Sequence, residues 1–424
     1  MSLDGLMQKS HGFQVRLGPA ASVEPHRRRP IHVLTLTPFY PFAGDNGYGC
    51  FVSEPIAHFE NVHVRSSVIA LRPIYRRPVS PHPSVPEATW LRYLQIPSNI
   101  GLPSSGLFLF PQLLCHVVRI HKENKIDLIH AHGALPCGYA AMLIYKSMKI
   151  PFAVSAHGLD VFTTRQAKGL SGYWCKKFSS SVYRSARRVI CVSERVQQEI
   201  LKEIGNSVKT TVVYNGVDTA LFSPVAEEER ARRFIILSVG NLISVKGHDT
   251  VLRALPEIIV KYPMLRYEII GDGPERPRLK ALSEELKISK WVHFLGRQSR
   301  GEVANAMKRC MVFALPSEYE ALGCVYLEAM ATAKPVIACR GQGIEEIVRH
   351  GENAWLIGTG NVDAMREALS RLLEDAGIRE RLGKEGRQTV IEGLTWEHQA
   401  DRLRNVYTEC MEENWKPKIE KQTR

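Results

Sequence analysis

The chain has 424 residues, about two to three times the length of an ordinary single domain, which excludes one small module and predicts two domains. Hydrophobic residues make up 44% of it and charged residues 23%, a composition that excludes disordered and fibrous proteins. The formal net charge of +13 is concentrated in residues 1–220, which hold 25 Lys and Arg against 13 Asp and Glu, whereas residues 221–424 hold 31 against 30. The first half should therefore attract an anionic partner, whether a phosphorylated small molecule, an anionic membrane or a nucleic acid.

The N-terminal residues 1–29 are expected to form a flexible basic leader, which ends in three arginines and lacks the apolar core of a secretory signal. The nine cysteines are scattered along the chain without a CxxC pair or a metal-ligand spacing. Both features favour a reduced protein that stays in the cytoplasm.

Short β-branched runs alternate with helical segments from residue 31 onward, a pattern typical of a parallel sheet covered by helices. The proline-rich stretch 72–86 can form neither a regular helix nor a central strand, so we expect it at the surface. A first Rossmann-like domain is predicted over residues 30–218, with strands at 31–36, 65–71, 128–131, 152–155, 189–192 and 211–214.

A linker with a proline and a charge run is expected at 219–233, and a second series of strands and helices follows it. The second Rossmann-like domain is predicted over residues 219–395, with strands at 234–240, 266–271, 292–296, 312–317, 335–339 and 354–358. One long polar helix should then run from residue 396 to about residue 415. Two doubly wound α/β domains in tandem face an interdomain cleft at the carboxyl ends of both sheets, where ligands bind.

The string SEYEALGCVYLEAMATAKPVIA carries the strongest functional motif, because it places Glu320 and Glu328 eight residues apart around a glycine turn at Gly323. Backbone N–H groups of Leu322, Gly323 and Cys324, at the positive end of the following helix, would face a diphosphate. One carboxylate on each side would accept hydrogen bonds from hydroxyl groups. Two glutamates at this spacing are usually solvated residues of a helix, but the glycine turn and the preceding apolar strand favour a nucleotide-sugar site.

This string resembles the E-x7-E signature of glycosyltransferase family 4, whose members are retaining enzymes of the GT-B fold. Three more strings resemble family segments in the same order: VVYNGVDTALF between the domains, SVGNLISVKGHD at the phosphate loop, and EIIGDGPERPRL with Gly271 and Gly273 in its turn. The resemblance covers roughly residues 31–407. It implies that the second domain binds a UDP- or GDP-linked sugar, with Glu320 positioning the sugar and Glu328 the ribose.

The resemblance also implies roles for four other residues of the second domain. Lys246, at the start of a helix, would neutralise charge on the leaving diphosphate. Many family members have Arg where this chain has Asn241, so one positive charge is missing or comes from elsewhere. Arg297 and Gln298, at a strand end, would border the base. The C-terminal helix resembles the family element that crosses back onto the first domain.

Two segments of the first half also match the family. The glycine-rich loop TPFYPFAGDNGYGCFV differs from the commoner double-glycine form, and Gly47 and Gly49 would let its backbone approach phosphates or the acceptor. The alternative is that this loop only connects the first strand to the following helix and contacts no ligand. His157 matches the position where a histidine lies against the transferred sugar, binding a hydroxyl or assisting charge development. His130 and His132 could equally be structural, and the three histidines lack a zinc-ligand pattern.

Basic residues between 168 and 188 alternate with aromatic ones, which fits either a surface against anionic lipid or a solvated helix with core aromatics. No nucleic-acid-binding module accompanies the charge. By the resemblance, we expect a retaining glycosyltransferase with a glycan or lipid-linked acceptor, in polysaccharide or glycoconjugate biosynthesis. It would be cytoplasmic or peripheral on the inner membrane face.

The catalytic residues would be His157, Lys246 and Glu320. No DxD triad stands in a metal-binding context, so neither a metal nor another cofactor is expected. The alternatives are a GT-B phosphorylase or epimerase, a catalytically silent sugar-nucleotide-binding scaffold, and a basic polyanion-binding protein.

Overall fold

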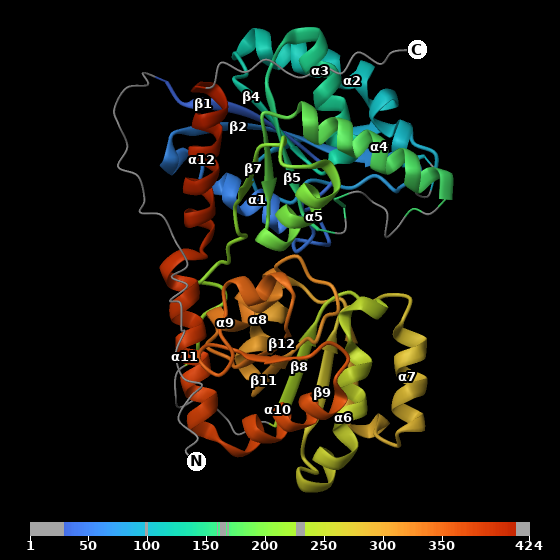
Figure 1. The fold of residues 1–424 in the computed structure, drawn as a ribbon, viewed down its shortest axis with the longest axis vertical. Helices are drawn as coiled ribbons and strands as arrows, with labels where there is room; N and C mark the ends of the chain where they lie inside the picture. Colours follow the sequence, from blue (N-terminus) through green and yellow to red (C-terminus); the bar gives the residue numbers. More distant parts are fainter. Residues whose placement is uncertain are drawn as a thin grey trace, which may run out of the picture.

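The computed structural model describes residues 29–97, 101–158, 160–161, 167, 169–225 and 234–412. Apart from Arg29, the expected leader lies outside these residues, as do residues 226–233 of the expected linker. The described residues form two α/β units, which lie one above the other in Figure 1 and are each built on a parallel sheet.

The first unit contains a seven-stranded sheet in the order β3-β2-β1-β4-β5-β6-β7, with every neighbouring pair parallel. All residues of its central strands are buried, as expected for a sheet covered on both faces. The strands are β1 Ile31–Thr37, β2 Val64–Pro73, β3 Ala88–Tyr93, β4 Leu128–His132, β5 Phe152–Ala156, β6 Arg188–Cys191 and β7 Thr210–Val212.

Strand β3 is absent from the sequence-based prediction, which ended the proline-rich stretch at residue 86 and placed the next strand at residues 128–131. Among the described strands, β3 pairs with β2 alone and lies at the sheet edge. Leu91 and Tyr93 are buried, whereas Thr89 and Arg92 are exposed. An edge strand alternates in this way because only one of its faces is covered, so its apolar signal is weak.

The second unit contains a six-stranded sheet in the order β10-β9-β8-β11-β12-β13, which is also parallel throughout. Each of its strands falls within a predicted segment. The strands are β8 Ile235–Val239, β9 Arg266–Ile270, β10 Val292–Gly296, β11 Val312–Ala314, β12 Val336–Cys339 and β13 Trp355–Ile357.

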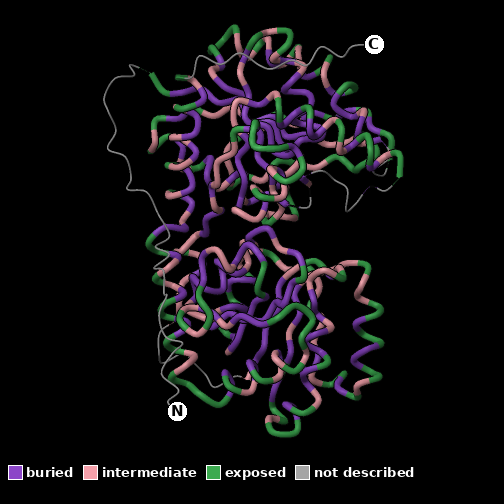
Figure 2. The backbone as a smooth tube through the Cα atoms, in the orientation of Figure 1, coloured by how far each residue is buried: buried purple, intermediate pink, exposed green. Residues whose placement is uncertain are grey.

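Helices cover both faces of both sheets, and Figure 2 shows the buried chain running through the middle of each unit. Among the described residues, no helix is both long and apolar enough to cross a membrane. The first unit has α1 Cys50–Ala57, α2 Leu102–Glu123, α3 Tyr139–Met148, α4 Gly169–Ser185 and α5 Glu194–Ile204. The second has α6 His248–Lys261, α7 Arg276–Glu285, α8 Arg300–Arg309, α9 Cys324–Ala331, α10 Val362–Glu374 and α11 Ala376–Gly393.

The last helix, α12 (Trp396–Glu412), lies against the first unit although the preceding α11 lies against the second (Figure 1). Leu403 and Tyr407 pack into the same core cluster as Leu128 of β4. The Tyr407 hydroxyl is 2.8 Å from Nδ1 of His130. The chain therefore crosses between the units twice, once after β7 and again at α12.

Each sheet reverses its strand order at one point, between β1 and β4 in the first and between β8 and β11 in the second. Loops after the two central strands diverge there, which leaves a crevice at the carboxyl ends. Lys246 follows β8 and Glu320 follows β11, so both lie at the reversal point of the second sheet.

Candidate functional site

A cleft of about 700 Å³ lies between the two units and is lined by loops at the carboxyl ends of the strands. Among the described residues that line it, one is a lysine, Lys246, and one is an arginine, Arg297. The lining residues are Gly44, Asp45, Asn46 and His82 from the first unit and Val239, Gly240, Asn241, Lys246, Ile270, Gly271, Arg297, Gln298, Ser299, Glu302, Val303, Glu320, Gly323, Cys324 and Val325 from the second.

Lys246 and Glu320 form an ion pair in this cleft, with 2.5 Å between Nζ and Oε2. Their side chains are only 17% and 13% exposed. The backbone N–H of Glu320 donates to the side-chain oxygen of Gln342, 3.0 Å away, which holds the loop after β11 in place. The cleft therefore contains an ammonium, which can bind an anionic group of a ligand, next to a carboxylate, which can accept hydrogen bonds from hydroxyl groups.

The glycine turn before α9 is required by packing. Gly323 has φ +82°, and a Cβ at this position would lie 2.7 Å from the ring of Tyr326. The Tyr326 hydroxyl donates to the backbone oxygen of Leu315 at 2.6 Å, so the ring cannot easily move aside. Helix α9 consequently begins at Cys324, and its first N–H groups lie at the cleft.

Two glycines after β9 allow its loop to approach the loop after β8. A Cβ on Gly271 would lie 1.9 Å from the oxygen of Gly240, and one on Gly273 would lie 2.4 Å from the oxygen of Leu242. Gly271 lines the cleft, but Gly273 does not. For both residues the structure gives a packing reason that is independent of any ligand.

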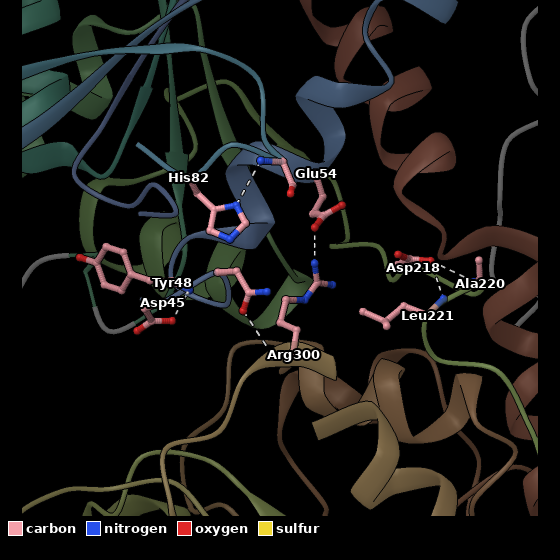
Figure 3. A network of polar contacts seen from close by, with 10 residues as sticks. Asp45, Tyr48, Glu54, His82, Asp218, Ala220, Leu221 and Arg300 are labelled. Carbon is pink, nitrogen blue, oxygen red and sulfur yellow. Dashed lines mark hydrogen bonds and ion pairs between the residues drawn. The ribbon is translucent and has the colours of Figure 1, made fainter. Parts of the chain in front are cut away.

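The first unit contributes a wall that the sequence did not reveal. The proline-rich loop before β3 packs on the glycine-rich loop, through a backbone bridge between Phe42 and Pro81 and a 2.7 Å hydrogen bond from the Tyr40 hydroxyl to the Pro86 oxygen. This contact brings His82 beside Asp45 at the cleft (Figure 3). A proline-rich composition carries no signal for such a role, because it depends on which loop the segment packs against.

The two predicted glycines of that loop, Gly47 and Gly49, do not line the cleft. Gly49 has φ +75°, and its Cβ would meet the backbone of Phe39 at 2.4 Å. A Cβ on Gly47 would lie 3.6 Å from Cγ of Arg300, which belongs to the other unit. Gly49 therefore serves close packing, whereas a Cβ on Gly47 would make only an ordinary van der Waals contact.

Several polar contacts join the units around the cleft. Arg297 lies 3.5 Å from Asp45, and Arg300 forms an ion pair with Glu54 of α1 (Figure 3). At the N-terminus of α5, the Glu346 carboxylate accepts hydrogen bonds from the backbone N–H groups of Glu194 and Arg195, at 2.7 and 2.8 Å. The Tyr319 hydroxyl donates to Glu199 at 3.0 Å.

His157 lies just outside the cleft lining, in a cluster of three histidines. Its Nε2 is 3.1 Å from Nδ1 of His132, and the two rings stack at 5.2 Å. His130 is held by Ser155 and Tyr407, each at 2.8 Å. Burial lowers the pKa of His157 to about 4, so its imidazole is neutral near pH 7.

The His157 loop nevertheless contacts the loop that carries Glu320. Gly158 has φ +117°, and a Cβ there would lie 2.7 Å from Cβ of Ala321. The backbone N–H of His157 donates to Asp160 at 2.8 Å, which orients this turn. His157 can therefore offer a neutral hydrogen-bonding group next to the Glu320 loop.

Glu328 and Leu322 are also outside the lining. Leu322 is fully buried in the core of the second unit. Glu328 lies one helical turn beyond Cys324 on α9 and is buried, which raises the pKa of its carboxyl to about 7. Arg300 lowers this pKa and Glu54 raises it.

The cleft thus brings together eight of the fourteen residues that the sequence singled out and leaves six in its surroundings. Those in the lining are Asn241, Lys246, Gly271, Arg297, Gln298, Glu320, Gly323 and Cys324. Those outside it are Gly47, Gly49, His157, Gly273, Leu322 and Glu328.

Two family models match consecutive parts of the chain. The model described as Glycosyltransferase Family 4 matches residues 58–221, and the model described as Glycosyl transferases group 1 matches residues 222–389. An uncharacterized glycosyltransferase of Methanocaldococcus jannaschii is 30% identical over 304 residues, which cover 68% of this chain and 77% of that protein.

Another relative and a solved structure extend the comparison. The GDP-mannose-dependent monoacylated alpha-(1-6)-phosphatidylinositol monomannoside mannosyltransferase of Corynebacterium glutamicum is 26% identical over 328 residues, 72% of this chain and 83% of that protein. The Anabaena protein HepE, solved in complex with UDP and glucose, superposes with a TM-score of 0.69 at 20% identity and covers 89% of this chain and 99% of its own. The chain therefore belongs to the family 4 glycosyltransferases and has their GT-B fold.

Proposed function

We propose that the protein transfers a sugar from a nucleotide-diphosphate donor to a hydroxyl group, and that its second unit binds the donor. The observation that carries this proposal is the Lys246–Glu320 pair, which lies at the strand-order reversal of the second sheet and beside the start of α9. An ammonium and a helix N-terminus suit a diphosphate, and a neighbouring carboxylate suits the hydroxyls of the sugar.

In this proposal Lys246 and the first turn of α9 neutralise the departing diphosphate, and Glu320 positions the sugar. Arg297 and Gln298 border the base. Glu328, one turn along α9 from Cys324 of the lining, accepts hydrogen bonds from the ribose. UDP and GDP are both candidates: HepE was solved with UDP, and the Corynebacterium relative is named as GDP-mannose-dependent.

We further propose that the reaction retains the anomeric configuration and needs no metal. The family resemblance implies front-face attack, in which the leaving phosphate helps to deprotonate the acceptor. Lys246 and the α9 N-terminus offer positive charge for the leaving group. The neutral His157 would bind a hydroxyl of the transferred sugar rather than act as a cation.

The domain assignment and the acceptor belong to the same proposal. Residues 30–218 with the helix from residue 396 would form the acceptor domain, and residues 219–395 the donor domain. A lipid-linked acceptor at an anionic membrane is supported by α4, where Leu170, Tyr173 and Trp174 are 81%, 58% and 42% exposed. Lys177 lies 4.9 Å from the Trp174 ring, and Lys168 of this segment is outside the described residues.

A thermal-shift screen with UDP, GDP, ADP and their common sugar conjugates, each with and without EDTA, tests this proposal. Ligand binding to the folded state raises its stability by mass action. We expect a shift with one base that the chelator does not change, and we expect Glu320→Gln to abolish transfer from that donor while the variant still binds its nucleotide.

Several outcomes would contradict the proposal. Absence of a shift with every nucleotide would overturn the donor site and favour a polyanion-binding protein. Nucleotide binding without transfer to any glycan or lipid-linked acceptor would favour a silent scaffold. An inverted anomeric centre, read by NMR of the product, would contradict retention. Equal partitioning into neutral and anionic vesicles would contradict the anionic membrane.

A further inference from the structure

The loop after β12, residues 340–343, holds the backbone of Glu320. The N–H of Glu320 donates to the side-chain oxygen of Gln342 at 3.0 Å, and its backbone oxygen accepts a hydrogen bond from the N–H of Gly343 at 3.1 Å. A Cβ on Gly343 would lie 1.4 Å from the oxygen of Ala321, so the two loops are in direct contact. The position of the Glu320 carboxylate therefore depends on the loop after β12.

Helix α5 of the first unit contacts both of these loops. Figure 1 shows α5 on the side of the first unit that faces the second unit. The guanidinium of Arg195 donates to the backbone oxygen of Gly341, and its Cζ lies 5.0 Å from the centre of the Tyr319 ring. One helical turn further along α5, the Glu199 carboxylate accepts a hydrogen bond from the Tyr319 hydroxyl at 3.0 Å. Arg195 and Glu199 therefore lie on one face of α5, and that face is turned toward the Glu320 loop.

The contacts of α5 fall on residues that adjoin Glu320 and its hydrogen-bond partner. Tyr319 directly precedes Glu320 in the chain, and Gly341 directly precedes Gln342. Tyr319 is buried, and the Glu320 side chain is only 13% exposed. A displacement of the Tyr319 ring or of Gly341 would therefore change the direction of the neighbouring carboxylate, which lines the cleft.

We propose that Arg195 and Glu199 are positioning residues, which orient Glu320 toward the sugar of the donor when the two units are closed. This inference rests on the proposed function, in which Glu320 positions that sugar. Neither Arg195 nor Glu199 is among the described residues that line the cleft, so both act through Tyr319 and the loop after β12. A hydrogen bond to a carboxylate and a guanidinium over the same ring hold that ring in one place. Separation of the units would remove both contacts.

The same contacts also join the two units, and the two roles predict different results. If α5 only holds the units together, breaking any contact between them should weaken the binding of nucleotides and of sugar nucleotides alike. If α5 orients Glu320, breaking its contacts should weaken only the part of the affinity that comes from the sugar. The groups that bind the diphosphate in the proposed function, Lys246 and the start of α9, would be unchanged.

The test is isothermal titration of the full chain with UDP, UDP-glucose, UDP-N-acetylglucosamine, GDP and GDP-mannose. We expect the unaltered chain to bind one sugar nucleotide about tenfold more tightly than the corresponding nucleotide, because Glu320 accepts charge-assisted hydrogen bonds from the sugar. Glu199→Ala and Tyr319→Phe should each reduce this ratio to below about threefold and change the affinity for the nucleotide itself by less than about twofold. Their effects should not add in the double variant, because both remove the same hydrogen bond.

Two other substitutions test the chemistry of the contacts. Glu199→Gln should keep most of the ratio, because its amide oxygen still accepts the hydrogen bond from Tyr319. Arg195→Met should reduce the ratio as Glu199→Ala does, since it removes both the donor to Gly341 and the cation over the ring. Glu199 is partly exposed, so Glu199→Ala decides the question if Tyr319→Phe does not fold.

Two variants serve as controls. Glu203→Gln removes a charge from the same helix, where Glu203 pairs with Lys176 of the first unit at 2.5 Å. Glu54→Gln weakens the ion pair with Arg300, a contact between the units that involves neither loop around Glu320. Both variants should keep the ratio of the unaltered chain.

Each contrary outcome has a distinct meaning. A folded Glu199→Ala or Arg195→Met chain that keeps the ratio would overturn the positioning role of the replaced residue. An equal loss of the ratio in Glu54→Gln would overturn both roles, because closure of the units would then explain the effect. A ratio of one for every sugar nucleotide in the unaltered chain would overturn the contact between Glu320 and the sugar. Binding of no nucleotide by the unaltered chain would overturn the donor site itself, and this inference with it.

Discussion

At the scale of single residues, the cleft holds its charges in pairs. Lys246 and Glu320 neutralise each other at 2.5 Å, and neither is strongly exposed. A bound donor would exchange this pair for two better-matched contacts, the ammonium with the diphosphate and the carboxylate with sugar hydroxyls. Because the side chains are already held in place before the donor binds, little reorganisation is needed when charge develops on the leaving group.

Replacing Lys246 should therefore affect the chemical step more than binding. We expect Lys246→Met to lower kcat by about 10²–10³-fold, with a smaller change in KM, since stabilisation of the leaving group grows toward the transition state. Steady-state kinetics with the donor found in the nucleotide screen will give kcat and KM for the variant and for the unaltered chain. Lys261→Met, which removes an exposed lysine that pairs with Glu374 on the second unit, is the matched control and should leave kcat unchanged. Equal effects of the two variants would argue against a role in catalysis.

At the scale of elements, the cleft depends on loops that pack closely against one another. The loops after β8 and β9 are in contact where Gly271 faces the backbone of Gly240. In the turn before α9, Gly323 packs directly against the ring of Tyr326. These contacts place Lys246, Asn241 and the α9 N-terminus around one space. Side chains of the loops can line the cleft only because the glycines remove the Cβ atoms that would hold the backbones apart.

Gly271→Ala should accordingly destabilise the second unit. Its Cβ would lie 1.9 Å from the Gly240 oxygen, and φ is +138°, a conformation that alanine rarely adopts. We expect a loss of about 1–3 kcal/mol in the free energy of unfolding, measured by urea denaturation. Gly301→Ala is the matched control, because nothing lies within 4 Å of its Cβ position in α8. It should be neutral or slightly stabilising. An unaffected Gly271→Ala chain would show that the loops can separate without cost.

At the scale of the whole molecule, polar contacts hold the two units together. Arg300 with Glu54 is one such contact, and Glu346 at the N-terminus of α5 makes another. The Glu346 carboxylate accepts two backbone hydrogen bonds at the positive end of a helix, which is a favourable site for a negative charge. Donor binding should act on the balance between open and closed arrangements of these contacts.

Weakening the Glu346 contact should open the molecule. We expect Glu346→Gln to increase the radius of gyration of the ligand-free protein in small-angle X-ray scattering, because an uncharged amide binds the helix N-terminus less strongly. The nucleotide that shifts the melting temperature should restore the compact value. Glu345→Gln is the matched control: its carboxylate accepts from Gly341 within its own unit at 2.5 Å, so the dimensions should not change. An unaltered radius in both variants would assign closure to the other contacts.

Both sheets could be predicted from local pattern, apart from β3. Runs such as Ile31–Leu36 and Ile235–Val239 are buried on both faces, and buried parallel strands have a continuous apolar sequence that is easy to find. Strand β3 escaped because it is half covered at an edge and follows a proline-rich loop. The E-x7-E string and two of the other family strings contain residues that line the cleft, and the matches to the two family models confirm the family.

Local sequence therefore determined the fold class, the family and the loops that carry Lys246 and Glu320. Buried strands appear as short apolar runs, and tight turns appear as glycines directly after them, so both can be recognised from neighbouring residues. Tertiary structure alone decided that His82 and Asp45 wall the cleft, that His157 stacks on His132, and that Arg300 of the second unit pairs with Glu54 of the first. These arrangements join segments more than twenty residues apart and, for Arg300, two separate units. Their geometry follows from how loops and units pack, and no local pattern encodes such packing.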